Sequence, residues 1–173
     1  IPLSIFFIIE ANDVVTFLGG NAYEDATLCM QILMPILIVS GFSNITGNQI
    51  LLPHGKDISY MKAVIMGALV DIILNLIFMP RYSLYGAALA TLMAEIVQML
   101  LQLWEAKKYL KNNVDFKGLF KIVLSCFVST VITCLVMYNN TFNSIIALII
   151  SFTIYVGIYI LMMFLLMVSK RAK

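Results

Sequence analysis

Residues 67–98 have the sequence GALVDIILNLIFMPRYSLYGAALATLMAEIVQ, which predicts two apolar helices joined by the polar turn Pro80–Ser83. Each helix is long enough to cross a hydrocarbon core of about 30 Å. Asp71 lies in the middle of the first helix and Glu95 in the middle of the second. A carboxylate at that depth costs roughly 2.5–3.5 kcal/mol on insertion, so it is usually found facing a bundle interior or a wet cavity. The stretch therefore predicts a membrane-embedded helical bundle with a polar interior.

The composition places the whole chain in the same class. Hydrophobic residues make up 62% of its 173 residues, charged residues make up 12%, and the mean hydropathy is +0.99. Soluble globular domains are about half apolar and about a quarter charged, so the composition excludes an ordinary soluble domain. At about 20 residues per span, the chain has room for roughly five to seven transmembrane helices.

Hydropathy and turn residues predict six spans and hence an all-α integral membrane fold. Pro35 and Gly41 are positions where the second span could kink. The chain begins at Ile1 within an apolar run and without a basic region, so we expect no signal peptide, a missing N-terminal part and a first span that is truncated. The predicted spans are residues 1–18, 27–52, 60–80, 84–105, 118–138 and 144–168.

The basic residues predict the orientation of these spans. Ten of the eleven Lys and Arg residues fall in alternate loops and in the C-terminal segment, whereas the opposite loops contain Arg81 together with Glu24 and Asp25. Because cytoplasmic loops are enriched in Lys and Arg, the basic side, which includes Lys107–Lys121 and the C-terminus, is expected in the cytoplasm. There it can also meet anionic lipid head groups.

Polar residues recur at helical spacing within three of the predicted spans. Gly67, Asp71 and Asn75 share one helical face, and antiparallel packing would place Asp71 and Glu95 at similar depth. Two such acids could bind a cation, relay protons or contact a polar substrate; alternatively, each could be hydrogen-bonded to a neighbour and serve only helix packing. The candidates for a substrate or coupling-ion pathway are Glu10, Asn44, Asn48, Asp71, Asn75, Glu95 and Gln98.

Two of these groups have alternatives of their own. Ser40, Asn44 and Asn48 form an amide-rich stripe in the second span, which could line an aqueous path and bind sugar hydroxyls or could bridge neighbouring helices. Glu10 and Asp13 lie in the outer half of the first span, where they could simply border the external mouth of a cavity.

The sequence contains no pattern typical of a catalytic or metal site. It has one histidine, His54, and its three cysteines are not arranged at metal-binding spacing. A P-loop, a Gly-rich dinucleotide motif, a nucleophile elbow and a metalloprotease motif are also absent. We therefore expect no enzymatic activity, no cofactor, no metal and no nucleic-acid partner.

Several elements between residues 18 and 98 resemble the bacterial polysaccharide (O-antigen) flippases of the multidrug/oligosaccharidyl-lipid/polysaccharide exporter superfamily. Their order and spacing agree, while the last two spans match only in hydropathy. One position departs from the family, which often has Asn where this chain has Asp71. The elements are Gln49-x-Leu51-x-Pro53-x-Gly55-Lys56, Gly67, Leu74-Asn75, Pro80, Tyr85-Gly86-Ala87-Ala88, Ala90-Thr91 and Glu95.

This resemblance implies a two-lobed transporter in which residues 1–173 form the C-terminal six-helix lobe and the N-terminal lobe is missing. The implied substrate is an undecaprenyl-pyrophosphate-linked oligosaccharide, moved by alternating access across the bacterial cytoplasmic membrane for cell-surface polysaccharide synthesis. The implied partners are this substrate, the lipid bilayer, the N-terminal lobe, and H⁺ or Na⁺ as coupling ion. Six helices alone are not expected to transport.

Two other hypotheses remain open at this point. A cation-coupled drug or small-solute antiporter of the same fold would use the same acids to bind its coupling ion. A membrane scaffold without transport activity would instead tolerate isosteric amides at Asp71 and Glu95.

Overall fold

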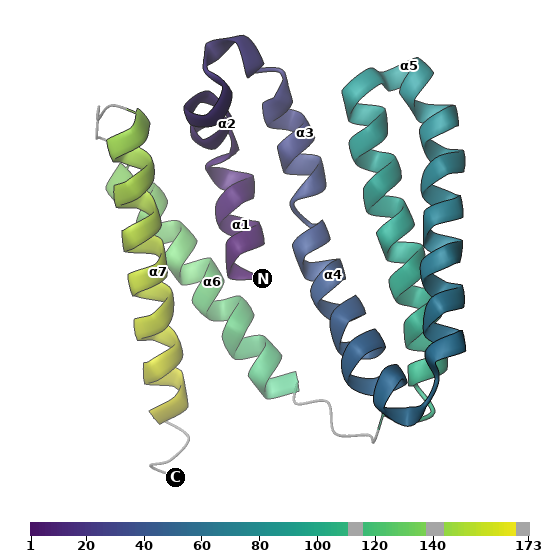
Figure 1. The fold of residues 1–173 in the computed structure, drawn as a ribbon. Helices are drawn as coiled ribbons and strands as arrows, with labels where there is room; N and C mark the ends of the chain where they lie inside the picture. The colour runs from purple at the N-terminus through teal and green to yellow at the C-terminus, as the bar shows by residue number, and fades with distance from the viewer. Residues whose placement is uncertain (111–115, 138–143, 169–173) are drawn as a thin grey trace. The chain divides into compact units, whose positions relative to one another are not determined.

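The computed structural model describes residues 1–110, 116–137 and 144–168, which fold into helices joined by short turns, with no strand among them. Contacts within the chain gather into two compact units (Figure 1). One unit comprises Ile1–Thr27 and Val114–Lys173, and the other comprises Leu28–Asn113.

The second unit begins with a helical segment that is broken at a proline. Helix α3 (Ala26–Leu33) ends shortly before Pro35, and α4 (Ile36–Asn44) follows it. Proline lacks a backbone N–H and clashes with the preceding turn, which explains the interruption. The kink predicted at Pro35 is therefore confirmed, whereas Gly41 lies inside α4 without a break.

A π-helix, η2 (Ile45–Leu51), continues directly from α4 and leads into the short 3₁₀ helix η3 (Leu52–His54). Gly55 ends this segment with a φ of 66°, a left-handed conformation that glycine adopts without a steric penalty. A π-helix widens the helical turn and changes which side chains share a face. The regular i, i+4 pattern of the sequence therefore does not continue through η2.

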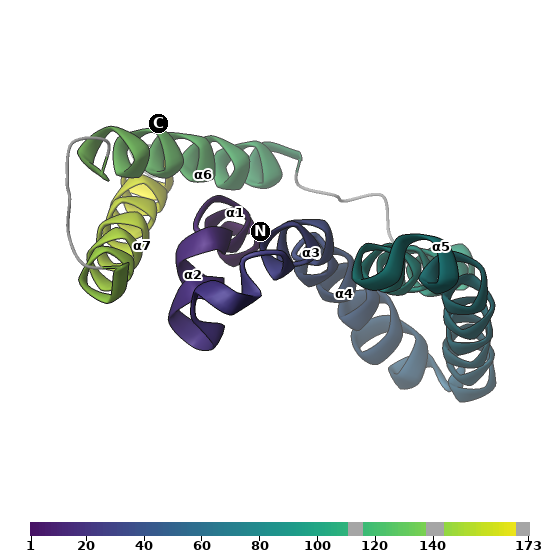
Figure 2. The same cartoon turned by 90° about the horizontal axis from the view of Figure 1, so that it is seen from above.

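Helix α5 (Asp57–Ala106) is a hairpin of two antiparallel arms, which lie side by side in both views (Figures 1 and 2). The chain reverses at Ser83, whose φ of 52° and ψ of −128° are non-helical. Gly86 then packs directly on the first arm, because an added Cβ would lie 2.5 Å from the carbonyl oxygen of Phe78. The segment before Ser83 is called the first arm and the segment after it the second arm. They correspond to the predicted spans 60–80 and 84–105.

The first unit contains a bent helix pair packed on two longer helices. Helices α1 (Pro2–Ile9) and α2 (Ala11–Gly19) meet at Glu10 at an angle of 73°. They pack against α6 (Phe116–Met137) and α7 (Ser144–Val168). Phe6 is buried in an edge-to-face contact with Phe152, with ring centroids 5.3 Å apart. The first predicted span is thus helical but broken, which its uninterrupted hydropathy did not indicate.

The lengths of these helices agree with membrane insertion. Within the described residues, three helices are long and apolar enough to cross a membrane, and the bent pair α1–α2 provides a fourth candidate. Because α5 reverses at Ser83, it accounts for two of the predicted spans. The apolar part of α6, Phe120–Val136, is shorter than the others. All six predicted segments therefore fall on helices, except that residue 138 lies outside the described residues, and the chain is a multi-pass membrane protein.

Candidate functional site

A pocket of about 210 Å³, with both polar and apolar side chains in its wall, lies between the two arms of α5. Asp71 contributes from the first arm, and Thr91, Glu95 and Gln98 contribute from the second. The hairpin geometry brings the two acids together because each lies about a dozen residues from the reversal at Ser83. The structure thus places Asp71 and Glu95 at the walls of one pocket, in the middle of otherwise apolar helices.

The Asp71 carboxylate has a defined partner on its own helix. Asn75 donates through Nδ2 to Asp71 Oδ1 at 3.1 Å and to the Asp71 carbonyl oxygen at 2.9 Å. Both contacts join residues one helical turn apart on the first arm, and they fix the orientation of the Asp71 carboxylate. A second pocket of about 360 Å³ continues past this pair toward Met79 and Pro80. Asp71 therefore lies where two pockets meet, with Asn75 holding it in place.

A third pocket of about 110 Å³ lies between α4, η2 and α5. Glu95 and Gln98 line it as well, so the same two side chains border both this pocket and the one that contains Asp71. Nearly every residue that lines it is polar. They are Ser40, Ser43, Asn44, Asn48, Tyr60, Glu95, Gln98 and Gln102.

Buried hydrogen bonds form the base of this third pocket. Ser43 donates through Oγ to Gln102 Oε1 at 2.9 Å, and the Thr46 hydroxyl lies 3.1 Å from the same oxygen. Gln98 Nε2 lies 3.4 Å from Ser43 Oγ. Ser43 and Thr46 were not among the predicted site residues, because they lie off the stripe of Ser40, Asn44 and Asn48. The only indication in the sequence was that both are small polar residues shortly before Gly47.

Two glycines allow the helices to approach this closely. A Cβ added at Gly47 would lie 2.5 Å from Cε2 of Tyr60, and one added at Gly67 would lie 2.9 Å from Cβ of Gln98. Small residues at membrane helix interfaces permit such close backbone contact. The positions of Gln98 and of the Ser43–Gln102 pair therefore depend on residues that have no functional group of their own.

The third pocket is polar, the other two combine a few polar groups with mostly apolar walls, and none of the three carries a positive charge. No Lys or Arg lines any of the three pockets described above, whereas Asp71 and Glu95 are half-buried acids. Carboxylates and amides can accept hydrogen bonds from hydroxyl groups or bind a cation, whereas the carboxylates repel a phosphate. The arrangement suits sugar hydroxyls or a small cation.

Glu10 is the one candidate residue in the other unit. It lies at the break between α1 and α2, close to Asp13 and to Ser151 of α7. Broken membrane helices frequently border ion and substrate sites, so Glu10 stays a candidate. The other six candidates, namely Asn44, Asn48, Asp71, Asn75, Glu95 and Gln98, line the pockets of the second unit.

A metal site is not found among the described residues, where no group of three or more His, Cys, Asp or Glu side chains could hold an ion. The three cysteines, Cys29, Cys126 and Cys134, are free thiols.

Comparison with known proteins agrees with the predicted resemblance. No protein-family model matches the chain. It is 26% identical over 164 residues to an uncharacterized membrane protein of Methanocaldococcus jannaschii, covering 94% of this chain and 32% of that protein. It is 24% identical over 110 residues to a putative O-antigen transporter of Escherichia coli, covering 64% of this chain and 26% of the transporter.

The fold is that of a solved flippase. The structure of the lipid II flippase MurJ, in an inward closed conformation, superposes on 94% of this chain and 34% of its own chain, with a TM-score of 0.76 and 22% sequence identity. The chain spans about a third or less of the length of the proteins that it matches. The likeness to a flippase is thus confirmed at the level of the fold, and the prediction of an all-α membrane protein is confirmed with it.

Proposed function

We propose that this chain forms one lobe of a flippase that moves a lipid-linked oligosaccharide across a membrane by alternating access. The proposal rests on the fold, which is like that of the lipid II flippase, and on sequence similarity to a putative O-antigen transporter. The substrate that we propose is a polyprenyl-pyrophosphate-linked repeat unit used for cell-surface polysaccharide. A second lobe, N-terminal to this one, would provide the other wall of the cavity.

The observation that carries the proposal is that Glu95 and Gln98 line two neighbouring pockets, which bring acids, amides and hydroxyls together between apolar helices. A sugar–pyrophosphate head group cannot cross about 30 Å of hydrocarbon unaided, whereas its lipid tail can remain in the bilayer. A polar cavity that opens alternately to each side lowers this barrier. The amides and acids of the second unit would supply hydrogen-bonding groups for such a cavity.

The charge of the pockets indicates that the two lobes contact different parts of the substrate. Because Asp71 and Glu95 face pockets that no Lys or Arg lines, the pyrophosphate is not expected against them. We propose that these side chains bind sugar hydroxyls or a coupling cation, H⁺ or Na⁺. Cationic contacts to the pyrophosphate would then come from the N-terminal lobe.

The membrane and the orientation follow from the same proposal. We place the protein in the cytoplasmic membrane of a bacterium with its C-terminus in the cytoplasm, on the basis of the distribution of Lys and Arg. The similar proteins come from a bacterium and an archaeon, and both are described as membrane proteins or transporters. A transport role also accounts for the lack of catalytic motifs in the sequence.

One observation favours a second candidate, a cation-coupled antiporter for drugs or small solutes. Two acids border a single pocket of about 210 Å³, a size that suits an ion better than an oligosaccharide. In a flippase the same acids would serve coupling while the sugar occupies the wider cavity between lobes. The two functions therefore differ in substrate and not in the role of the acids.

Complementation separates these possibilities. The protein that contains this chain would be expressed in a bacterial strain lacking its polysaccharide flippase, and surface polymer would be measured beside drug resistance. Restored polymer without new drug resistance is expected for the flippase. Drug resistance without polymer would assign the antiporter, and neither activity in cells with normal membrane abundance would favour a scaffold.

A further inference from the structure

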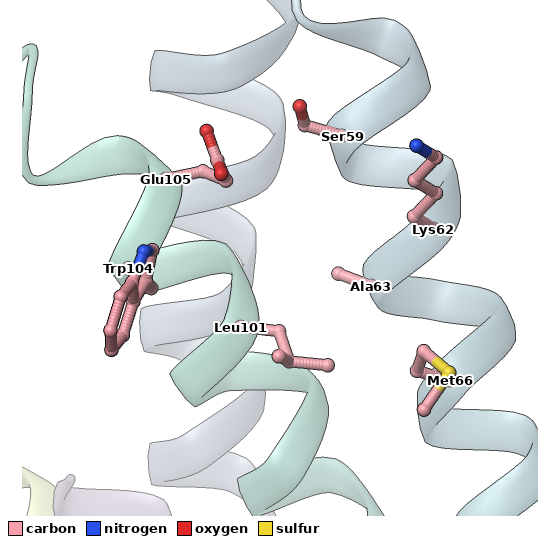
Figure 3. A pocket seen from close by; sticks show the side chains of 7 residues that line it. All are labelled: Ser59, Lys62, Ala63, Met66, Leu101, Trp104 and Glu105. Carbon is pink, nitrogen blue, oxygen red and sulfur yellow. The ribbon is translucent and has the colours of Figure 1, made fainter.

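A groove of about 490 Å³ lies between the two arms of α5, near the ends remote from Ser83 (Figure 3). We call it the interfacial groove. The first arm contributes one set of side chains and the second arm the other. The residues that line it are Ser59, Lys62, Ala63 and Met66 on the first arm and Leu101, Trp104 and Glu105 on the second.

The interfacial groove is separate from the polar pockets. On the first arm it uses positions 59, 62, 63 and 66, whereas the pocket that contains Asp71 uses positions 64, 67, 68 and 71. At about 100° per residue, these two sets occupy different faces of the arm. The groove therefore opens on a side of the hairpin that the proposed transport path does not use.

The groove is apolar along the arms and polar at its end. Ala63, Met66 and Leu101 provide its apolar wall, and Met66 and Leu101 are 46% and 39% exposed. One turn further toward the end of the hairpin, Ser59 and Lys62 provide a hydroxyl and an ammonium group. An apolar wall that leads to a polar end matches a lipid, whose apolar acyl chain is attached to a polar head group.

Positive charge predominates at the polar end. Lys107 places its Nζ over the ring of Trp104, 4.2 Å from the centroid. Glu105 is the acid of the groove, and Lys108 lies 3.5 Å from its Oε2 and offsets its charge. Because Lys108 offsets the charge of Glu105, Lys62 remains as the uncompensated charge among the residues that line the groove, which favours an anionic head group.

We propose that the interfacial groove binds an anionic phospholipid, with its phosphate at Lys62 and an acyl chain along Met66 and Leu101. Trp104, 66% exposed, fits the aromatic belt that marks the level of lipid head groups. Basic pockets between transmembrane helices bind such lipids elsewhere. The site does not require the proposed flippase activity; it requires only that this end of α5 lies at a membrane surface.

Trp104 provides the test, because it is the single tryptophan of this chain. The protein would be reconstituted in phosphatidylcholine nanodiscs that contain a small fraction of phosphatidylglycerol with brominated acyl chains, which quench nearby indole fluorescence. The Trp104→Phe variant provides the baseline for fluorescence from elsewhere in the protein. Brominated phosphatidylglycerol is expected to quench Trp104 at several-fold lower mole fractions than brominated phosphatidylcholine.

Matched variants locate the site. Lys62→Gln should weaken the apparent binding of phosphatidylglycerol by about fivefold, as expected for one lysine near an anionic head group. Lys56→Gln removes an exposed lysine that does not line the groove and should have a much smaller effect. Leu101→Trp fills the groove without changing its charge and, read by native mass spectrometry, should release the bound lipid.

Three results would overturn the proposal. Equal quenching by the two brominated lipids would mean that Trp104 contacts bulk lipid only. Equal losses for Lys62→Gln and Lys56→Gln would assign the preference to general surface charge. Competition by inorganic phosphate at matched concentration would show a site for the free anion. Each variant is compared only if its size-exclusion profile is like that of the unmodified protein.

Discussion

The side-chain oxygen of Gln102 accepts a hydrogen bond of 2.9 Å from the hydroxyl of Ser43, a residue 59 positions earlier in the chain. Gln102 is 1% exposed and Ser43 is 5% exposed, so neither group can exchange its partner for water. The bond joins α4 to the second arm of α5 beside the pocket that Asn44, Asn48 and Glu95 line. It thus joins the helix that carries the stripe of Ser40, Asn44 and Asn48 to the arm that carries Glu95.

This bond should contribute measurably to stability. Interhelical hydrogen bonds in membrane proteins are worth about 0.6 kcal/mol on average and about 1.7 kcal/mol at most. A double-mutant cycle of Ser43→Ala and Gln102→Met, followed by denaturant unfolding in mixed micelles, should give a coupling energy in this range. Gln49→Met, at an exposed position of η2, is the control and should not couple to Ser43→Ala. If Ser43→Ala and Gln102→Met change the free energy of unfolding by strictly additive amounts, the bond does not contribute to stability.

Gly67 should be sensitive to even the smallest side chain. A Cβ there would lie 2.9 Å from both Cβ and Oε1 of Gln98, so Gly67→Ala must move Gln98 or separate the arms. Overpacking of this kind typically costs about 1–3 kcal/mol. Gly41→Ala is a matched control, because nothing lies within 4 Å of its added Cβ and alanine favours the helix.

The readout for both glycines is the thermal unfolding midpoint in detergent together with membrane abundance. Gly67→Ala should unfold at a lower temperature, while Gly41→Ala should unfold at the same or a higher temperature. Equal midpoints for the two variants would contradict the close contact between Gly67 and Gln98.

The sequence was sufficient to predict the hairpin and the break in the second span. Span length, the turn residues Pro80–Ser83 and the two mid-span acids are all local properties, and antiparallel packing then brings Asp71 and Glu95 to one pocket. Pro35 also acts locally, because it removes a backbone donor from the helix. These features required no knowledge of the tertiary contacts.

Other features depend on contacts that a local pattern does not contain. The 73° bend at Glu10 occurs in an apolar run without Pro or Gly at the break, so hydropathy predicts one straight span. The π-helix at Ile45–Leu51 changes the helical periodicity, and the bond from Ser43 to Gln102 spans most of the second unit. The bend, the π-helix and this hydrogen bond therefore cannot be predicted from the hydropathy pattern alone.

The orientation of the hairpin can be tested by labelling. In a background with Cys29, Cys126 and Cys134 replaced by alanine, Lys108→Cys should be protected from an impermeant thiol reagent in intact cells, and Glu24→Cys should react. The distribution of basic residues is the reason, because it places Lys108 in the cytoplasm. Labelling of Lys108→Cys from outside would invert the proposed topology.

The two acids should matter for transport more than for folding. Asp71 and Glu95 line one pocket, and Asn75 fixes the orientation of Asp71 through a 3.1 Å hydrogen bond. Asp71→Asn and Glu95→Gln keep the shape of each side chain while removing its charge. If either acid binds the coupling cation, transport should fall by about tenfold or more, which corresponds to about 1.4 kcal/mol of lost stabilisation.

Membrane abundance and unfolding midpoint distinguish this outcome from misfolding, and both should stay near the values of the unmodified protein. Glu24→Gln removes an exposed acid outside the pockets and should transport normally. Asn75→Ala leaves both charges in place but frees the Asp71 carboxylate, so it should weaken transport less than Asp71→Asn does. Full transport by both single variants and by the double variant would mean that the acids only join helices. A loss in Asp71→Asn alone would instead place the cation at the Asp71–Asn75 pair, where the flippases that this chain resembles often have Asn in place of the acid.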